Sequence, residues 1–213
     1  MYTRNFLITI ILVLAAAGSV VNATAGSRSK RQKKALISKQ APRSPLSRTM
    51  PDGRRWNIEN LNIAIPGSVC FDGNQANCSI YGRLYTWEQA TKVCSMLGRG
   101  WVLPSDDEWR TLAKKFGGLV ADSADNGKSA YKALMTGGES GFNAILSGGR
   151  DPDGSYARLN AHGFYWTSTE SDQAESWMIN FAKGSLLMNH HSIQKARALA
   201  VRCIKAKRSR QGR

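Results

Sequence analysis

The side chains best suited to bind a ligand gather in one loop-forming stretch. Asp151 and Asp153 stand in an Asp-Pro-Asp-Gly run, and Tyr156, Asn160 and His162 follow it. Carboxylate and amide oxygens are the ligands that calcium takes. A calcium loop of the helix-flanked type also needs a Glu further along, and the sequence has none at that distance. We therefore predict an Asp-Gly turn here, and these five residues form a ligand-binding hypothesis without a metal.

Three other groupings of reactive side chains have structural explanations. His190 and His191 are neighbours on an expected strand, so they point to opposite faces and cannot easily share one ion. The acidic run from Asp106 to Glu108 stands where a helix begins and its dipole favours negative charge. The segment 122–127 has alanine at calcium-ligand positions. Since the sequence also lacks a Gly-x-Ser-x-Gly elbow, we predict no catalytic residue, no metal and no cofactor.

The four cysteines, Cys70, Cys78, Cys94 and Cys203, fit an oxidising compartment. Zinc is disfavoured because the spacings contain no Cys-x-x-Cys pair and no paired histidines at finger spacing. Three disulfide connectivities are possible. We favour Cys70–Cys78, which closes a small polar loop, and Cys94–Cys203, which closes most of the domain. Cys94 falls on the apolar face of an expected helix and Cys203 on that of an expected strand, so both point inward.

Two capping boxes mark the starts of the main helices. Thr86 is followed by Gln89, and Ser105 by Glu108, at the spacing in which side chains satisfy free backbone N–H groups. Apolar residues then recur at helical spacing until glycines end each run. A third, short helix is predicted over residues 128–135.

From residue 137 onward the pattern becomes β-like. Lys183-Gly184 is a plausible hairpin turn, and Trp166 and Trp177 lie within strand patterns that place them in the core. Helices followed by an antiparallel sheet indicate an α+β domain. Short strands are predicted over residues 56–58, 142–146, 163–169, 176–182, 186–189 and 198–204.

The positive charge is confined to two arms. The chain has 213 residues and a formal net charge of +15. Residues 26–50 hold eight basic and no acidic residues, and residues 204–213 hold five basic and no acidic ones. Residues 51–203 hold sixteen basic and fifteen acidic residues, so the folded part is almost neutral. The first arm has too few apolar residues to offset the entropy of ordering it, and it is predicted to be a flexible linker.

The amino terminus has the form of an export signal. Residues 1–5 carry one positive charge, residues 6–21 are apolar, and Ala23-Thr24-Ala25 has the small-x-small form of a cleavage site. The apolar run is short for a membrane span of about 20 residues, so no stable membrane span is expected after cleavage. The predicted organisation is a signal peptide (1–25), a basic linker (26–50), one domain (51–205) and a basic tail (206–213).

An ordered set of phrases resembles a known family, the Fibrobacter succinogenes major paralogous domain family. The resemblance runs from about residue 50 to residue 205. The phrases are Asp52-Gly53-Arg54-Arg55-Trp56-Asn57-Ile58-Glu59-Asn60-Leu61-Asn62, Tyr81-Gly82-Arg83-Leu84-Tyr85-Thr86-Trp87, Gly100-Trp101-Val102-Leu103-Pro104-Ser105-Asp106-Asp107-Glu108-Trp109, Phe142-Asn143-Ala144, Gly148-Gly149-Arg150, Asp153-Gly154-Ser155, Tyr165-Trp166-Thr167-Ser168-Thr169-Glu170 and Val201-Arg202-Cys203.

The resemblance implies an exported bacterial protein whose domain is related to the C-type lectin fold. That fold has two main helices, a twisted antiparallel sheet and a long looped region, with a disulfide from the first helix to the last strand, which agrees with Cys94–Cys203. It also implies adjacent chain ends. Family members often have an extra pair of strands before the Asp-Gly-x-x-Trp phrase, where this chain has its basic linker. The triplets of calcium-dependent sugar-binding lectins are absent, so that activity is not implied.

These observations favour a non-catalytic binding module, secreted or held in the periplasm or at the cell surface, that recognises a glycan or protein ligand through its looped face. One alternative is an enzyme on the related formylglycine-generating type of fold, although no reactive cysteine arrangement supports it. Another is binding of an anionic polymer through the basic arms. Export argues against nucleic acid as that polymer and fits an anionic cell-surface polymer better.

Overall fold

The computed structural model describes residues 46–207. The predicted signal peptide, nearly all of the predicted basic linker and the end of the predicted basic tail lie outside the described residues. Within the described part, no helix is long and apolar enough to cross a bilayer.

Capping side chains define where the two main helices begin. The Thr86 side chain accepts from the backbone N–H of Gln89, and the Gln89 side chain accepts from the backbone N–H of Thr86. Ser105 and Glu108 form the same reciprocal pair, so both predicted capping boxes are confirmed. The predicted third helix is also present. The helical elements are η1 (Phe71–Gly73), α2 (Gln75–Tyr81), α3 (Trp87–Val93), η2 (Cys94–Leu97), α4 (Asp106–Lys114), η3 (Val120–Asp122) and α5 (Lys128–Leu134).

The strands form two sheets. One has the order β1-β2-β9-β3 and the other the order β5-β4-β6-β7-β8. In the larger sheet β4 and β6 are parallel, while the other pairs are antiparallel, so the sheet is mixed where an antiparallel one was predicted. The strands are β1 (Ser47–Thr49), β2 (Arg55–Asn57), β3 (Trp101–Val102), β4 (Ser147–Arg150), β5 (Tyr156–Leu159), β6 (His162–Glu170), β7 (Glu175–Ala182), β8 (Leu187–Gln194) and β9 (Ile204–Lys205).

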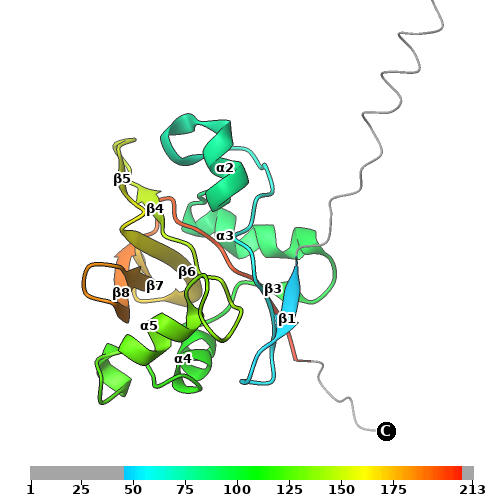
Figure 1. The fold of residues 1–213 in the computed structure, drawn as a ribbon. Helices are drawn as coiled ribbons and strands as arrows, with labels where there is room; N and C mark the ends of the chain where they lie inside the picture. Colours follow the sequence, from blue (N-terminus) through cyan, green and yellow to red (C-terminus); the bar gives the residue numbers. More distant parts are fainter. Residues whose placement is uncertain (1–45, 208–213) are drawn as a thin grey trace, which may run out of the picture. The chain divides into compact units, whose positions relative to one another are not determined.

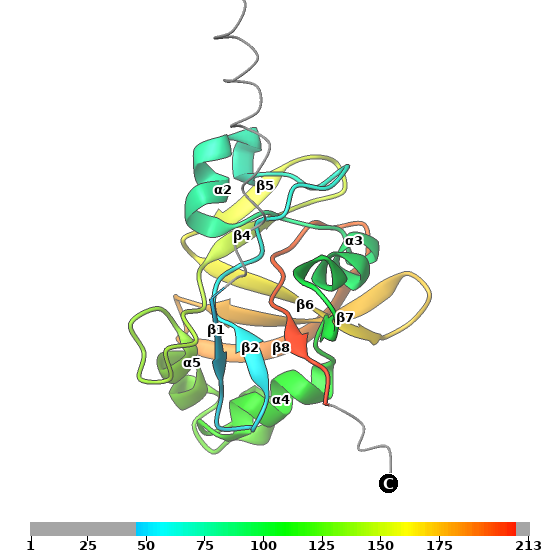
Figure 2. The ribbon, with the colours of Figure 1, turned by 90° about the vertical axis from the view of Figure 1, so that its right-hand side faces the viewer.

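Both faces of the larger sheet contribute to the core. Helices α4 and α5 lie on one side of β6, β7 and β8, and α3 lies on the other (Figures 1 and 2). On the first side, Trp56, Trp109 and Tyr165 are fully buried in one cluster. On the second side, Trp166 packs with Leu199 and with the cysteines that join α3 to the last segment. The predicted core position of Trp166 is therefore confirmed.

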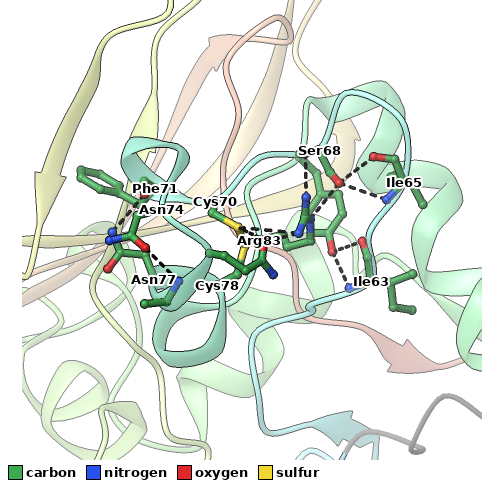
Figure 3. Close-up of a disulfide and its surroundings, with 12 residues drawn as sticks. Ile63, Ile65, Ser68, Cys70, Phe71, Asn74, Asn77, Cys78 and Arg83 are labelled. Carbon is green, nitrogen blue, oxygen red and sulfur yellow. Dashed lines mark hydrogen bonds between the residues drawn. A yellow bond between two sulfur atoms is a disulfide. The ribbon is translucent and has the colours of Figure 1, made fainter. Parts of the chain in front are cut away.

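Both favoured disulfides are present, Cys70–Cys78 and Cys94–Cys203. The first was expected to close a small polar loop. The segment is instead helical, because Asn74 accepts a hydrogen bond of 3.0 Å from the backbone N–H of Ala76 and so caps α2. Arg83 braces this bridge (Figure 3). Its guanidinium donates to the Ser68 carbonyl at 3.0 Å and lies about 3.5 Å from both sulfur atoms.

The folded part begins before the predicted boundary at residue 51. Strand β1 pairs with β2 along its length, and Met50 is buried, with 2% of its surface exposed. Apolar packing against Trp56 therefore orders the end of the segment that composition assigned to the linker.

The two chain ends of the domain are not side by side. Strands β1 and β9 both pair with β2 in antiparallel fashion, so they run in the same direction with β2 between them. The chain consequently enters this small sheet at one end and leaves it at the other (Figures 1 and 2). The resemblance implied adjacent chain ends. In the structure both chain ends belong to the same small sheet, but they leave it at opposite ends.

Two predicted strands are largely replaced by irregular backbone. The segment 142–146 has one isolated bridge, and the regular strand begins at Ser147. In the segment 198–204, isolated bridges precede β9. A buried side chain explains the first change. Arg202 donates to the carbonyls of Phe142 and Asn143 at 2.8 and 2.6 Å, so these carbonyls are not available to a neighbouring strand.

An arginine–aspartate pair joins α4 to η3. Arg110 donates to Asp122 through two nitrogens, at 3.0 and 2.8 Å, and this hydrogen bonding holds the pKa of the Asp122 carboxyl below its usual range. Because the folded pKa lies below the unfolded one, the pair stabilises the fold above pH ~4 and loses that effect as the pH falls through the folded pKa.

We expect Asp122→Asn to lower the urea midpoint at pH 7 and to have progressively less effect as the pH falls below ~4. Urea unfolding from pH 7 to pH 2 measures this. Glu139→Gln is the control, because Glu139 is exposed, lies outside the helices and strands and has no hydrogen-bonded side-chain partner among residues 46–207. A difference in urea midpoint between Asp122→Asn and the wild type that stays constant from pH 7 to pH 2 would contradict the prediction.

Candidate functional site

A pocket of about 390 Å³ opens on one face of the larger sheet. Side chains two residues apart on a strand share a face, and the strand register brings lining residues of β6, β7 and β8 together on one face. Phe164 of β6 faces Asn180 of β7, and Met178 of β7 faces His191 of β8. The lining residues are Gly149, Asp151, Ala157, Arg158, His162, Phe164, Met178, Asn180, His191, Ile193, Arg197 and Leu199.

Polar groups surround an apolar floor in this pocket. Phe164, Met178 and Leu199 supply apolar surface. His162 lies over Phe164, with ring centroids 5.2 Å apart, and its Nδ1 is 3.0 Å from Oδ1 of Asn180. Among residues 46–207, neither Nε2 of His162 nor the side-chain nitrogen Nδ2 of Asn180 has a hydrogen-bond partner. The site therefore keeps polar atoms available beside the floor.

Charged residues form the rim. Asp151 and Arg197 make an ion pair with their side chains about one-third exposed. Burial lowers the pKa of the Arg197 guanidinium. Burial and the neighbouring imidazole of His190 lower the pKa of His191, so His191 favours its neutral form more than an ordinary histidine does. The rim thus offers a carboxylate acceptor, guanidinium donors and a neutral imidazole.

The structure brings two of the five predicted binding residues together. Asp151 and His162 both line the pocket. Asp153 instead holds a turn, accepting from the backbone N–H and the hydroxyl of Ser155 at 2.9 and 2.7 Å. Its carboxylate is thereby engaged within its own loop.

The other two predicted residues face α2 and its neighbouring turn. Tyr156 packs against Phe71, with ring centroids 5.1 Å apart, and Asn160 accepts a hydrogen bond of 3.0 Å from the Tyr81 hydroxyl. Tyr156 begins β5, and Asn160 lies in the turn between β5 and β6. They contact the segment beside the Cys70–Cys78 bridge, and neither lines the pocket.

Four polar lining residues were missed from the sequence: Arg158, Asn180, His191 and Arg197. Asn180 and His191 become neighbours only through the pairing of β7 with β8. The hairpin turn predicted at Lys183-Gly184 would not have placed them, because the loop between Ala182 and Leu187 has four residues and a two-residue turn shifts the register by two. Arg158 and Arg197 lie outside any alternating pattern, so no pattern in the sequence indicated them.

The other candidate clusters have structural roles. His190 stacks on Trp177, with centroids 4.7 Å apart, and its Nδ1 lies 3.1 Å from Asp106, on the face opposite to His191. Hydrogen bonds from Ser129 lower the pKa of Asp125 at the start of α5. Within the described residues, no group of three or more His, Cys, Asp or Glu side chains is placed to hold a metal ion.

The fold and the site together define an α+β domain, stapled by two disulfides, with a partly polar pocket on its larger sheet. The chain belongs to the Fibrobacter succinogenes major domain family, whose model matches residues 48–205. This confirms the resemblance drawn from the sequence phrases. No curated protein matches the chain.

Proposed function

We propose that this chain is an exported, non-catalytic binding module of the C-type-lectin-like kind, which recognises a glycan or protein ligand through the pocket and the adjoining loops of residues 150–162. One observation carries the proposal. The pocket places uncommitted hydrogen-bonding atoms of His162 and Asn180 beside an apolar floor, which is the composition of sites that bind small polar ligands.

The chemistry of the remaining residues supports binding without catalysis. All four cysteines are joined in disulfides, so no thiol is available as a nucleophile. The same bridges suggest an oxidising, extracellular environment, which agrees with the export signal predicted for residues 1–25.

The basic arms, residues 26–50 and 204–213, have a different proposed role. Their positive charge suits attachment to an anionic cell-surface polymer, because each basic residue adds a salt-dependent attraction. The domain would then be held near the cell by its arms while its pocket takes the ligand. Removal of residues 26–45 is expected to weaken attachment to cells at low salt and to leave binding by the pocket unchanged.

Filling the pocket tests the binding function. Ala157 lines the pocket from β5, so Ala157→Phe is expected to abolish most ligand binding by occupying the space over the floor. A glycan and peptide array identifies ligands for the wild type, and calorimetry then compares the variants. Ala174→Phe is the control, because Ala174 is exposed in the turn between β6 and β7. Equal binding by wild type and Ala157→Phe would show that the pocket is not the site.

A further inference from the structure

We propose that the pocket takes an acidic saccharide, and that Arg158 binds the carboxylate of its sugar. This inference rests on the proposed function, since it names the class of ligand for the same pocket. It is carried by the backbone that positions Arg158, by the charge balance of the rim and by the mixture of polar and apolar groups around the floor.

The backbone of β5 departs from regular strand geometry at Arg158, beside the pocket. Ala157 and Arg158 are consecutive, and both line the pocket. Consecutive residues of a regular strand point to opposite faces. Arg158 escapes this rule because its φ is 68°, in the left-handed region, and local departures of this kind re-aim side chains beside binding sites.

The opposite strand is adapted to the same bend. Gly148 of β4 lies across from Arg158 in the register, and its φ of 61° is also left-handed. A Cβ atom at Gly148 would lie 2.5 Å from the Ala157 carbonyl oxygen, so only glycine fits there. A left-handed conformation is unfavourable for arginine, and its retention within a strand pair points to a use for the side chain at this position.

Among residues 46–207, the guanidinium of Arg158 has no ion-pair partner, unlike the other two charged side chains, Asp151 and Arg197, that line the pocket. Asp151 is paired with Arg197. Arg158 is exposed, and although its backbone carbonyl accepts from the Ala161 N–H at 3.0 Å, its side chain makes no hydrogen bond or ion pair with any residue of 46–207. The other titratable groups of the lining are His162 and His191, which are neutral or positive. The net charge of the lining is therefore positive, and a guanidinium binds a carboxylate with two parallel hydrogen bonds.

The remaining lining favours a sugar over a simple anion. A sugar ring presents hydroxyls at its edge and C–H groups on its faces. The carboxylate of Asp151, the imidazole of His162 and the amide of Asn180 provide acceptors and donors for hydroxyls, while Phe164 and Leu199 provide apolar contact. The volume of about 390 Å³ lies near the lower end of the range for small-molecule sites, which suits a single sugar unit.

Titration with defined sugars tests this inference. Sodium glucuronate and sodium galacturonate are compared with glucose, galactose and sodium acetate, using NMR titration of the full secreted chain. We expect each uronate to bind at least about tenfold more tightly than its neutral parent, because a charge-assisted hydrogen bond is lost with the carboxylate. We also expect acetate to bind far more weakly than either uronate.

Arg158→Asn should remove the preference for the uronates, with a loss of about tenfold or more in their affinity. Asparagine tolerates a left-handed backbone, so this variant should fold as well as the wild type, which thermal unfolding checks. Arg99→Asn is the matched control, because Arg99 is exposed, lies outside the pocket lining and carries the same charge. It should retain the preference.

The outcomes separate this inference from the proposed function. Suppose that the uronates and their neutral parents bind with equal affinity, and that this binding is lost in Ala157→Phe and kept in Arg158→Asn. The pocket would then be a site for neutral glycans, and the inference of an acidic saccharide would be overturned. Acetate binding as tight as uronate binding would overturn the saccharide and leave an anion site. Peptide binding lost in Ala157→Phe, without sugar binding, would overturn the inference and keep the binding function. Failure to bind any of these ligands in the pocket would overturn both.

Discussion

Replacing Cys94 and Cys203 together by alanine is expected to lower the free energy of unfolding by about 5 kcal/mol in the chain-entropy account of disulfides. The bridge spans 109 residues, so its removal releases a long loop in the unfolded chain. Both sulfur atoms are completely buried between α3 and the last segment. Alanine leaves no buried hydroxyl without a partner, so the change reports mainly on the cross-link. Urea unfolding monitored by tryptophan fluorescence measures it.

The Cys70–Cys78 bridge provides the matched comparison. It closes a loop of only 8 residues, and its removal by the same double replacement should cost about 2.5 kcal/mol. The local hydrogen bonds of Asn74 and Arg83 should keep part of this segment ordered. Equal losses for the two double variants, or a larger loss for Cys70–Cys78, would contradict the loop-length argument.

Arg202→Met is expected to lower the free energy of unfolding by at least about 1–3 kcal/mol, the cost of leaving one buried hydrogen-bond acceptor without its donor. Arg202 is fully buried, and burial lowers the pKa of its guanidinium. No carboxylate is bonded to it within the described residues. Its three short hydrogen bonds go to oxygens of Asn60, Phe142 and Asn143, at 2.8, 2.8 and 2.6 Å, and the Asn57 carbonyl accepts a longer one of 3.4 Å. Methionine fills similar space and leaves these three acceptors unpaired.

The guanidinium also lies over the Phe142 ring, 4.8 Å from its centroid, so charge and shape both matter. Arg202→Lys keeps the charge and loses the planar fork, and it should be destabilised by a comparable amount. Arg99→Met controls for the loss of an arginine at the surface and should change the stability by less than about 0.5 kcal/mol. If Arg202→Met also changed the free energy of unfolding by less than about 0.5 kcal/mol, the oxygens of Asn60, Phe142 and Asn143 would have found other hydrogen-bond donors.

The local features of the fold were accessible from the sequence because each depends on residues close together in the chain. Thr86 with Gln89, and Ser105 with Glu108, predicted the starts of α3 and α4. The inward positions of Cys94 and Cys203 predicted the long-range bridge. By contrast, the strand predicted over residues 142–146 failed, because its carbonyls serve a side chain 60 residues away.

The candidate site could be predicted only in part, for the same reason: two of the five predicted residues line the pocket. Asp151 and His162 were identified by residue type and loop context, and both line the pocket. Tyr156 and Asn160 belong to the same loops but point to the neighbourhood of α2. Tyr156 faces away from Ala157 by strand alternation, and Asn160 lies in a turn where Arg158 and Asn160 are both left-handed, a conformation that no local pattern of residues indicates.

The sequence by itself determined the family, the α+β class, the disulfide pairing, the helix starts and the confinement of positive charge to two arms. These properties depend on composition, on spacing along the chain and on short-range hydrogen bonds. Only the tertiary structure decided that β4 and β6 run parallel, that Arg202 is buried and that Arg158 faces a pocket. The physical reason is that each of these depends on strand register and on partners supplied by distant segments, which become neighbours only when the sheets assemble.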